Sequence, residues 1–247
     1  FFGALESGMD SAMSGPIGAW AIPLAMVVAV LLMAGWLISM QEPADRGTVA
    51  SILVFIAFNT VFWIAFEQAG SSLNLFAEDN TNRVLFGWEV PTSWFQSINA
   101  LCVILLAPLF AGMWSRMGRR GRDPKPATKI GLALLLIAAS YLFMVFGAKL
   151  ASTGARVSMF WLTATYVVQT FGELCISPTG LGWVTKAAPA RFVSLLMGIW
   201  FLSSFLAGVL GGKLAAITDA IEQGKSLPTI GLDEYRTFSE AFDEGIY

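Results

Sequence analysis

Residues 49–76 read VASILVFIAFNTVFWIAFEQAGSSLNLF, an almost uninterrupted apolar run whose single charged residue is Glu67. A helix needs about 20 mostly apolar residues to cross the roughly 30 Å hydrocarbon layer of a bilayer, so this run is long enough to span one. Five more runs meet the same standard: 17–40, 94–114, 128–148, 157–182 and 192–215. All six are too long for the strands of a membrane barrel, so the predicted fold class is an all-α transmembrane bundle.

Composition supports a membrane protein over a soluble domain. Hydrophobic residues make up 56% of the 247 residues and charged residues only 13%, which is typical of a bilayer-embedded bundle. The first run is too long for a signal peptide and lacks a basic start. Histidine is absent, and Cys102 and Cys175 lie inside predicted spans. Neither a disulfide framework nor a metal site is therefore indicated, and any proton chemistry must use carboxylates.

The basic residues predict which side of the membrane each loop occupies. Loop 115–129 is the richest in them, with Arg116, Arg119, Arg120, Arg122, Lys125 and Lys129. The positive-inside rule places this loop in the cytoplasm. Such a cluster could instead bind nucleic acid or anionic lipid, but its position between two spans favours topology and no nucleic-acid partner.

The two ends of the chain indicate an excerpt from a longer protein. The sequence begins at Phe1 rather than Met, and residues 216–247 are acidic and contain no seventh apolar run. We expect residues 1–40 to be a linker with one span at 17–40, residues 41–215 to form a bundle of five spans, and residues 216–247 to be an extracytoplasmic loop.

Two glutamates inside predicted spans are the first functional signal. Glu67 and Glu173 lie well away from the span ends, and a carboxylate there costs at least about 2.5–3.5 kcal/mol. They could pair with buried amides or basic residues and hold helices together, or they could line a water-filled or ligand-binding cavity. Polar contacts between spans contribute only about 0.6 kcal/mol on average, which favours the cavity.

Helical periodicity places further polar residues around each glutamate. A straight helix from 49 through 78 would carry a polar stripe roughly 27 Å long, made of Thr60, Trp63, Glu67, Ser71, Asn74 and Glu78. A second polar face on 157–182 holds Tyr166, Gln169, Glu173 and Ser177, with Thr170 at its edge. Pro178 is expected to break or kink that helix.

Composition leaves two readings open for Asn99 and for Trp200. Asn99, near the start of its span, could bind a ligand or bridge helices. Trp200 could line a pocket together with Ser204, or it could face lipid. Small residues at Gly208 and Gly212 allow the last span to approach its neighbours closely.

Four motifs in order resemble the proton-dependent oligopeptide transporters of the major facilitator superfamily. Residues 62–72, FWIAFEQAGSS, resemble their seventh transmembrane helix, and Asn99 with Ala107-Pro108 resembles the eighth. Residues 171–181, FGELCISPTGL, resemble the tenth, and residues 197–202, MGIWFL, resemble the eleventh. The resemblance implies the C-terminal six-helix bundle without its last helix: helices 7 to 11 at 49–76, 94–114, 128–148, 157–182 and 192–215. The run 17–40 is similar to one of two extra helices between the bundles of bacterial members.

The resemblance also implies roles for individual residues. Glu173, assisted by Asn99, would hold the amino terminus of a di- or tripeptide, since an ammonium group needs charge and acceptors. Glu67 would pair with a base of the N-terminal bundle and take part in proton coupling, and Asp79 or Glu78 would be an extracellular gate acid. Residues lining side-chain pockets would be Trp63, Phe66, Ser177, Trp200 and Phe201.

The expected function is secondary active symport of di- and tripeptides with protons by alternating access, in a multi-pass inner-membrane protein that is not an enzyme. Its partners would be the peptides, the lipid bilayer and the N-terminal six-helix bundle of the same protein, and it would need no cofactor besides the coupling proton. The alternatives are a uniporter, a same-fold carrier of nitrate, a drug-like solute or an amino-acid derivative, and a proton-conducting subunit of a membrane enzyme. Retention of Glu173 favours a peptide over an anion, and no phosphate loop or nucleophile–base pair supports an enzyme.

Overall fold

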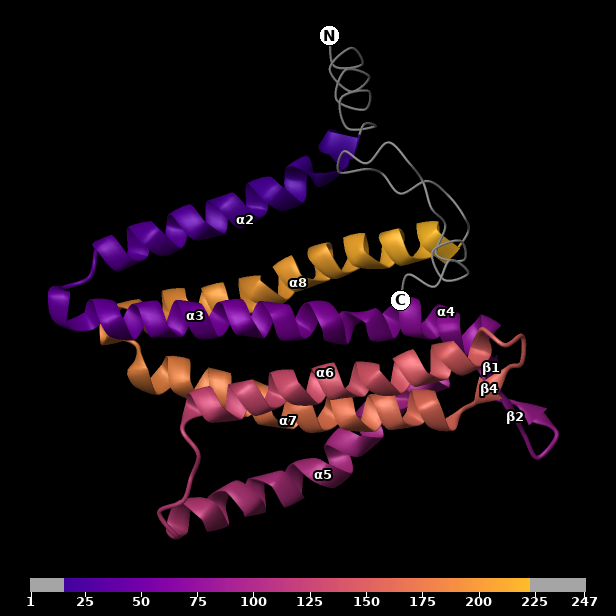
Figure 1. Ribbon diagram of the computed structural model, residues 1–247. Coiled ribbons are helices and arrows are strands. Elements are labelled where there is room, and N and C mark those ends of the chain that lie inside the picture. The colour runs from indigo at the N-terminus through magenta and orange to yellow at the C-terminus, as the bar shows by residue number, and fades with distance from the viewer. Residues whose placement is uncertain (1–15, 223–247) are drawn as a thin grey trace.

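Six long helices, one on each apolar run, make up most of the computed structural model, which describes residues 16–222, with side chains from 24 to 217 (Figure 1). They are α2 (Pro16–Ser39), α3 (Pro43–Phe66), α5 (Trp94–Arg119), α6 (Pro126–Ala151), α7 (Phe160–Ala187) and α8 (Val193–Glu222). Short helical segments are η1 (Glu67–Gly70), α4 (Ser72–Asp79) and η2 (Ala190–Phe192). The predicted stretches 1–15 and 223–247 lie outside the described residues.

Four segments are long and apolar enough to cross a membrane: Pro43–Asp79, Trp94–Arg119, Pro126–Ala151 and Ala190–Ile217. Helix α7 has 28 residues but is more polar, with Gln169 and Glu173 inside it. Its neighbours explain this, because α7 packs against α6, α5, α3 and α8 and so presents much of its surface to protein. Helix α2 qualifies as a shorter apolar helix over Leu24–Ser39. The chain is a multi-pass membrane protein.

Three apolar clusters hold the helices together. One joins α2, α3, α7 and α8 around Ile52, Ile56, Val184 and Ile199. A second joins α3, α6 and α7 around Phe62, Ile137 and Ile176. The third packs α4 and α5 against α6 and α7. Helix α5 lies at the edge of the bundle (Figure 1) and buries only Phe95 among its side chains, so most of its surface faces lipid or the rest of the protein.

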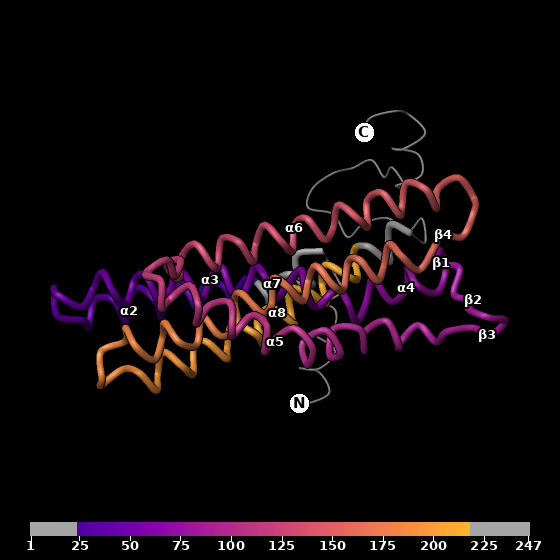
Figure 2. The backbone as a smooth tube through the Cα atoms, turned by 90° about the horizontal axis from the view of Figure 1, so that it is seen from below, coloured from indigo at the N-terminus to yellow at the C-terminus, as the bar shows by residue number. Residues whose placement is uncertain are grey.

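The loops alternate between two ends of the bundle. Figure 1 shows the α2–α3, α5–α6 and α7–α8 connections together at the left end, where the basic loop also lies. At the other end, β1 (Thr81–Asn82) pairs in parallel with β4 (Val157–Ser158). Strands β2 (Val84–Leu85) and β3 (Trp88–Glu89) form an antiparallel hairpin that projects beyond the helix ends (Figure 2). The alternation agrees with six successive spans.

The structure corrects two points about helix continuity, the unbroken helix over 49–76 and the break at Pro178. The run 49–76 is not one straight helix, because α3 ends at Phe66 and Ser71 leaves the helical region at φ −127° and ψ −96°. The polar stripe from Thr60 to Glu78 is therefore interrupted. Conversely, α7 continues through Pro178 to Ala187 without a break. Proline is tolerated inside spans because neighbouring helices can satisfy the freed backbone groups.

Candidate functional site

Glu173 and Asn99 meet between α7 and α5. The Asn99 Nδ2 donates a hydrogen bond of 2.8 Å to Glu173 Oε2. The same nitrogen lies 3.1 Å from Thr170 Oγ1, and that hydroxyl in turn donates to the Tyr166 carbonyl at 2.8 Å. The Asn99 amide is thus fixed by two acceptors one helical turn apart on α7, and its Oδ1 accepts no hydrogen bond from any described residue.

Glu67 occupies the break that follows α3. It begins the 3₁₀ segment η1 and is exposed. Gly70 favours a break because glycine is a poor helix former, and Gln68, Ser71 and Ser72 offer side-chain hydrogen bonds that compete with the backbone. The Ser72 hydroxyl donates to Gln68 Oε1 at 3.1 Å. The break places Glu67 at a point where the backbone departs from ideal α-helix.

Two tyrosines, the half-buried Tyr141 and the buried Tyr166, stabilise this break from the neighbouring helices. The Tyr141 hydroxyl on α6 donates to the Ala65 carbonyl at 2.6 Å, and the Tyr166 hydroxyl on α7 donates to the Ala69 carbonyl at 3.0 Å. In a bilayer there is no water to satisfy such carbonyls, so irregular backbone is tolerated only where protein or a wet cavity supplies donors.

Gln68 joins the same break to α8. It is buried, and its Nε2 donates to the Ile64 carbonyl at 3.1 Å and to the Gly211 carbonyl at 3.0 Å. A Cβ on Gly211 would stand 3.4 Å from that nitrogen, an ordinary contact distance, so alanine would also fit at this approach of α8. The break, α6, α7 and α8 therefore form one hydrogen-bonded unit.

A cavity of about 210 Å³ opens between the break, α5 and α7. Its lining residues are Phe66, Glu67, Ala69, Gly70, Gln96, Asn99 and Tyr166. Glu67 and Asn99 thus share one cavity, and Glu173 is tied to it through Asn99. Among the described residues the ion pairs are Arg83–Glu89 and Lys129–Asp123, so neither intramembrane glutamate has a basic partner there. The cavity thus presents the Glu67 carboxylate, which has no basic partner among the described residues, and the Asn99 amide.

The geometry has features of both alternatives for the glutamates, a contact that holds helices together and a wall of a binding cavity. The Asn99–Glu173 hydrogen bond connects two helices, as the structural alternative expects. Glu67, however, has an exposed side chain on a cavity wall, as the binding alternative expects. Among the side chains that the structure describes, residues 24–217, no three His, Cys, Asp or Glu are placed to hold a metal ion.

The other predicted site residues are spread over three places. Trp63 packs against Phe66 with ring centroids 5.0 Å apart, beside the cavity. Ser177 is half-buried on α7, one turn beyond Glu173. Glu78 and Asp79 are exposed at the end of α4, next to the β strands.

Trp200 and Phe201 are not brought to the polar cavity by the structure. Trp200 is only 5% exposed and belongs to the apolar cluster of α2, α3, α7 and α8. Its ring lies directly against Gly180, where a Cβ would stand 1.8 Å from the indole. Phe201 is 62% exposed. Trp200 therefore does not face lipid in this structure.

Four polar residues of the site were not singled out from the sequence: Asn59, Gln68, Gln96 and Tyr141. Asn59 is fully buried; its Nδ2 donates to Ser203 Oγ at 3.0 Å and its Oδ1 accepts from Trp63 Nε1 at 3.2 Å. An amide in the middle of an apolar run, four residues before Trp63, is the signal that could have identified it.

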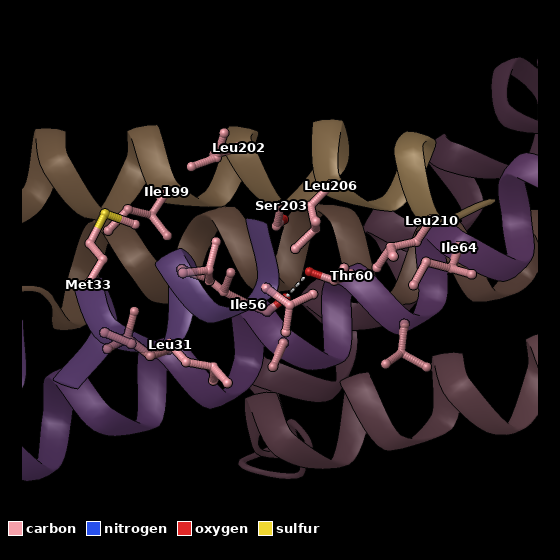
Figure 3. Close-up of a pocket in the computed structure, with 16 residues that line it drawn as sticks. Leu31, Met33, Ile56, Thr60, Ile64, Ile199, Leu202, Ser203, Leu206 and Leu210 are labelled. Atoms are coloured by element: carbon pink, nitrogen blue, oxygen red, sulfur yellow. Dashed lines mark hydrogen bonds between the residues drawn. The ribbon is translucent and has the colours of Figure 1, made fainter. Parts of the chain in front are cut away.

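A second cavity, of about 270 Å³, lies between α2, α3 and α8 (Figure 3). Its labelled polar residues are Thr60 and Ser203, whose hydroxyls donate to the Ile56 and Trp200 carbonyls of their own helices. The remaining lining is apolar. This cavity offers no free polar group for a charged solute, in contrast to the one at Glu67.

Sequence comparison agrees with this arrangement. The model of the POT family matches residues 22–230. The chain belongs to the POT family. It is 41% identical over 192 residues to the peptide transporter YePEPT of Yersinia enterocolitica, covering 75% of this chain and 37% of that protein. It is 32% identical over 201 residues to dipeptide and tripeptide permease A of Proteus mirabilis, covering 81% and 40%.

The fold is also that of solved POT family structures. A POT family transporter in complex with 5-aminolevulinic acid superposes with a TM-score of 0.73 at 28% identity, over 82% of this chain and 42% of the other. The predicted family and the all-α transmembrane fold class of the major facilitator superfamily are confirmed. The chain spans about two-fifths of the length of these POT proteins.

Proposed function

We propose that the complete protein is a proton-coupled symporter of di- and tripeptides, working by alternating access in the inner membrane. The observation that carries the proposal is the Asn99–Glu173 hydrogen bond beside the polar cavity. It leaves Asn99 Oδ1 without a donor among the described residues, next to a carboxylate. An ammonium group offers three donors and one positive charge, which fits this pair of acceptors.

The printed names of its POT relatives support a peptide as the solute. Relatives of 30–41% identity are named peptide transporter, dipeptide and tripeptide permease or di-/tripeptide transporter. Because the chain covers only part of them, the substrate of the whole protein is inferred and not shown by this half.

Glu67 supplies the coupling group in this proposal. Its carboxylate is exposed in the cavity and has no basic partner in the described half. We infer that a base of the N-terminal bundle pairs with it in one closed arrangement, and that protonation of Glu67 removes the charge and loosens that closure. Glu78 and Asp79, exposed at the far end of α4, would act as gate acids.

The test is transport by the full-length protein in liposomes. Dialanine should accumulate when the outside is acidified, and a protonophore should abolish the accumulation. Dialanine uptake that ignores the proton gradient would overturn the coupling, and saturable nitrate uptake that dialanine does not inhibit would overturn the substrate.

An amino-acid derivative is the second candidate solute. A POT family transporter of similar fold was solved with 5-aminolevulinic acid, which also presents a free ammonium group. Competition of this compound with labelled dialanine, compared with competition by trialanine, distinguishes a peptide carrier from a carrier of such derivatives.

A further inference from the structure

The β2–β3 hairpin exposes apolar side chains at the end of the bundle opposite the basic loop. Val84, Leu85 and Trp88 are exposed, and Phe86 at the tip is 100% exposed. Figure 2 shows the hairpin as the outermost described element at that end, next to the start of α5. A contiguous exposed apolar surface of this kind marks a contact with another protein surface or with a membrane.

The tip residue is unusual for its turn. Both central residues have positive φ, 52° for Phe86 and 82° for Gly87, the pattern of a type I′ turn. Asn, Asp or Gly occupies the first of these positions most easily, whereas a bulky side chain there is an outlier. The backbone therefore does not explain a phenylalanine at residue 86, and neither does the core, because its ring is wholly exposed.

The charges of the hairpin cancel. Arg83 and Glu89 are the charged residues between 83 and 94, and they form an ion pair of 2.7 Å across the two strands. Arg83 Nη1 also donates to the Val90 carbonyl at 2.8 Å. A hairpin without net charge enters the polar edge of a bilayer at lower cost than one with a free charge.

Tryptophans stand near both ends of two helices. Helix α5 carries Trp94 and Trp114, about 30 Å apart at 1.5 Å per residue, which matches the hydrocarbon thickness of roughly 30 Å. Helix α7 carries Trp161 and Trp183, about 33 Å apart by the same rise. Tryptophan prefers the headgroup level, so Trp94 lies at one edge of the bilayer.

The hairpin lies at the level of Trp94. The rings of Trp88 and Trp94 have centroids 5.2 Å apart. Phe86 is two residues from Trp88, so at most about 7 Å separates their backbones, whereas the headgroup zone is roughly 5–8 Å deep on each face. The tip therefore stays within reach of the headgroup zone.

We propose that the β2–β3 hairpin is a membrane-interface anchor, with Phe86, Leu85 and Trp88 seated in the lipid headgroup zone. The hairpin fixes the height of α4 and α5 against the bilayer, and α5 carries Asn99. If loop 115–129 is cytoplasmic, as the positive-inside rule predicts, the anchored leaflet is the outer one. The alternative occupants of the surface, the rest of the protein or a second copy, are outcomes of the test below.

The test is spin-label accessibility in the full-length protein in phospholipid vesicles. In a background with Cys102→Ala and Cys175→Ala, a label is placed by Phe86→Cys and its collision rates with oxygen and with a water-soluble nickel chelate are measured. Reference labels are placed by Leu135→Cys, exposed in the middle of α6, and by Arg122→Cys, exposed in the basic loop. We expect the label at residue 86 to have a higher oxygen collision rate than the label at residue 122. We also expect it to have a higher nickel collision rate than the label at residue 135.

Two results would overturn the anchor. A nickel collision rate at residue 86 as high as at residue 122 would place the hairpin in water. Low collision rates with both reagents would show a protein surface covering it. A second variant, Phe86→Asn, suits the turn better, so the hairpin should persist. A label at Leu85→Cys should then have a higher nickel collision rate than the same label in the protein with Phe86. An unchanged rate would contradict the anchor.

Discussion

The Asn99 side chain donates one hydrogen bond to Glu173 at 2.8 Å and another to Thr170 at 3.1 Å. Thr170 is thus a positioning residue for the amide beside the carboxylate. The sequence placed Thr170 only at the edge of the polar face of α7, whereas the structure gives its hydroxyl a direct hydrogen bond with Asn99.

Replacing Thr170 by valine should weaken peptide binding and leave folding intact. Valine keeps the shape and removes the acceptor, and a hydrogen bond contributes about 0.5–1.5 kcal/mol net, so the apparent affinity for dialanine should fall roughly two- to tenfold. Thr170→Ser retains the hydroxyl and should behave as the parent protein. Equal affinities for the valine and serine proteins, measured by competition against a labelled dipeptide, would contradict the positioning role.

Replacing Gly180 by alanine should destabilise the bundle through Trp200. The new Cβ would stand 1.8 Å from the indole, and overpacking of this kind costs about 1–3 kcal/mol. Gly182→Ala is the matched control on the same helix, since nothing lies within 4 Å of its Cβ position. Thermal unfolding of the purified protein should show a lower Tm for Gly180→Ala alone.

A second variant separates this clash from a general effect of alanine. Trp200→Leu shortens the side chain, so adding Gly180→Ala to it should lower the Tm little further. If Gly180→Ala lowers the Tm of the Trp200→Leu protein as much as it lowers the Tm of the parent, the indole is not the group that clashes with residue 180.

Replacing Gln68 by leucine should loosen the break after α3. The change leaves the Gly211 carbonyl without its donor and the Ser72 hydroxyl without its acceptor, at about 1–3 kcal/mol for an unsatisfied buried group. Backbone amides of Glu67–Ser71 should exchange faster with deuterium. Gly211→Ala, which makes only ordinary contact with Gln68, should not change exchange. Equal exchange in the parent and Gln68→Leu proteins would refute the stabilisation of the break by Gln68.

Helix positions followed from the sequence because length and apolar composition determine membrane crossing almost alone. The break at Glu67 did not, since it depends on partners far away in the chain: Gly211 lies 143 residues beyond Gln68, and Tyr141 and Tyr166 come from two other helices. Helical periodicity assumes a straight helix. The predicted polar stripe therefore crosses the break after Phe66, where the backbone is not α-helical.

The candidate site was predictable only in part. The intramembrane position of Glu67 and Glu173 singled both out, but their relation to Asn99 came from motif resemblance, because pairing between α5 and α7 is not encoded in local spacing. The motif predicts that Trp200 lines a pocket, and this stays a prediction; its packing against Gly180 in an apolar cluster depends on contacts between α7 and α8 that local spacing does not encode.

Glu67→Gln should uncouple transport from protons. The amide cannot change charge, so accumulation of dialanine on an acid-outside gradient should be lost, while exchange of labelled for unlabelled dialanine across the vesicle membrane should continue. Glu42→Gln, an exposed change in the loop before α3, is the control and should accumulate dialanine normally. Accumulation by the Glu67→Gln protein with the parent's pH dependence would remove Glu67 from the coupling.

The most direct measurement of the central claim is dialanine binding to the full-length Glu173→Gln protein beside binding of N-acetyl-dialanine to the parent. The glutamine can still accept from Asn99 and should fold normally, but it lacks the charge that attracts an ammonium group, and a charged hydrogen bond contributes about 1.5–3 kcal/mol. We predict that both measurements show affinity at least roughly tenfold below that of the parent for free dialanine. Parent-like affinity in either case would contradict the assignment of Glu173 to the peptide amino terminus.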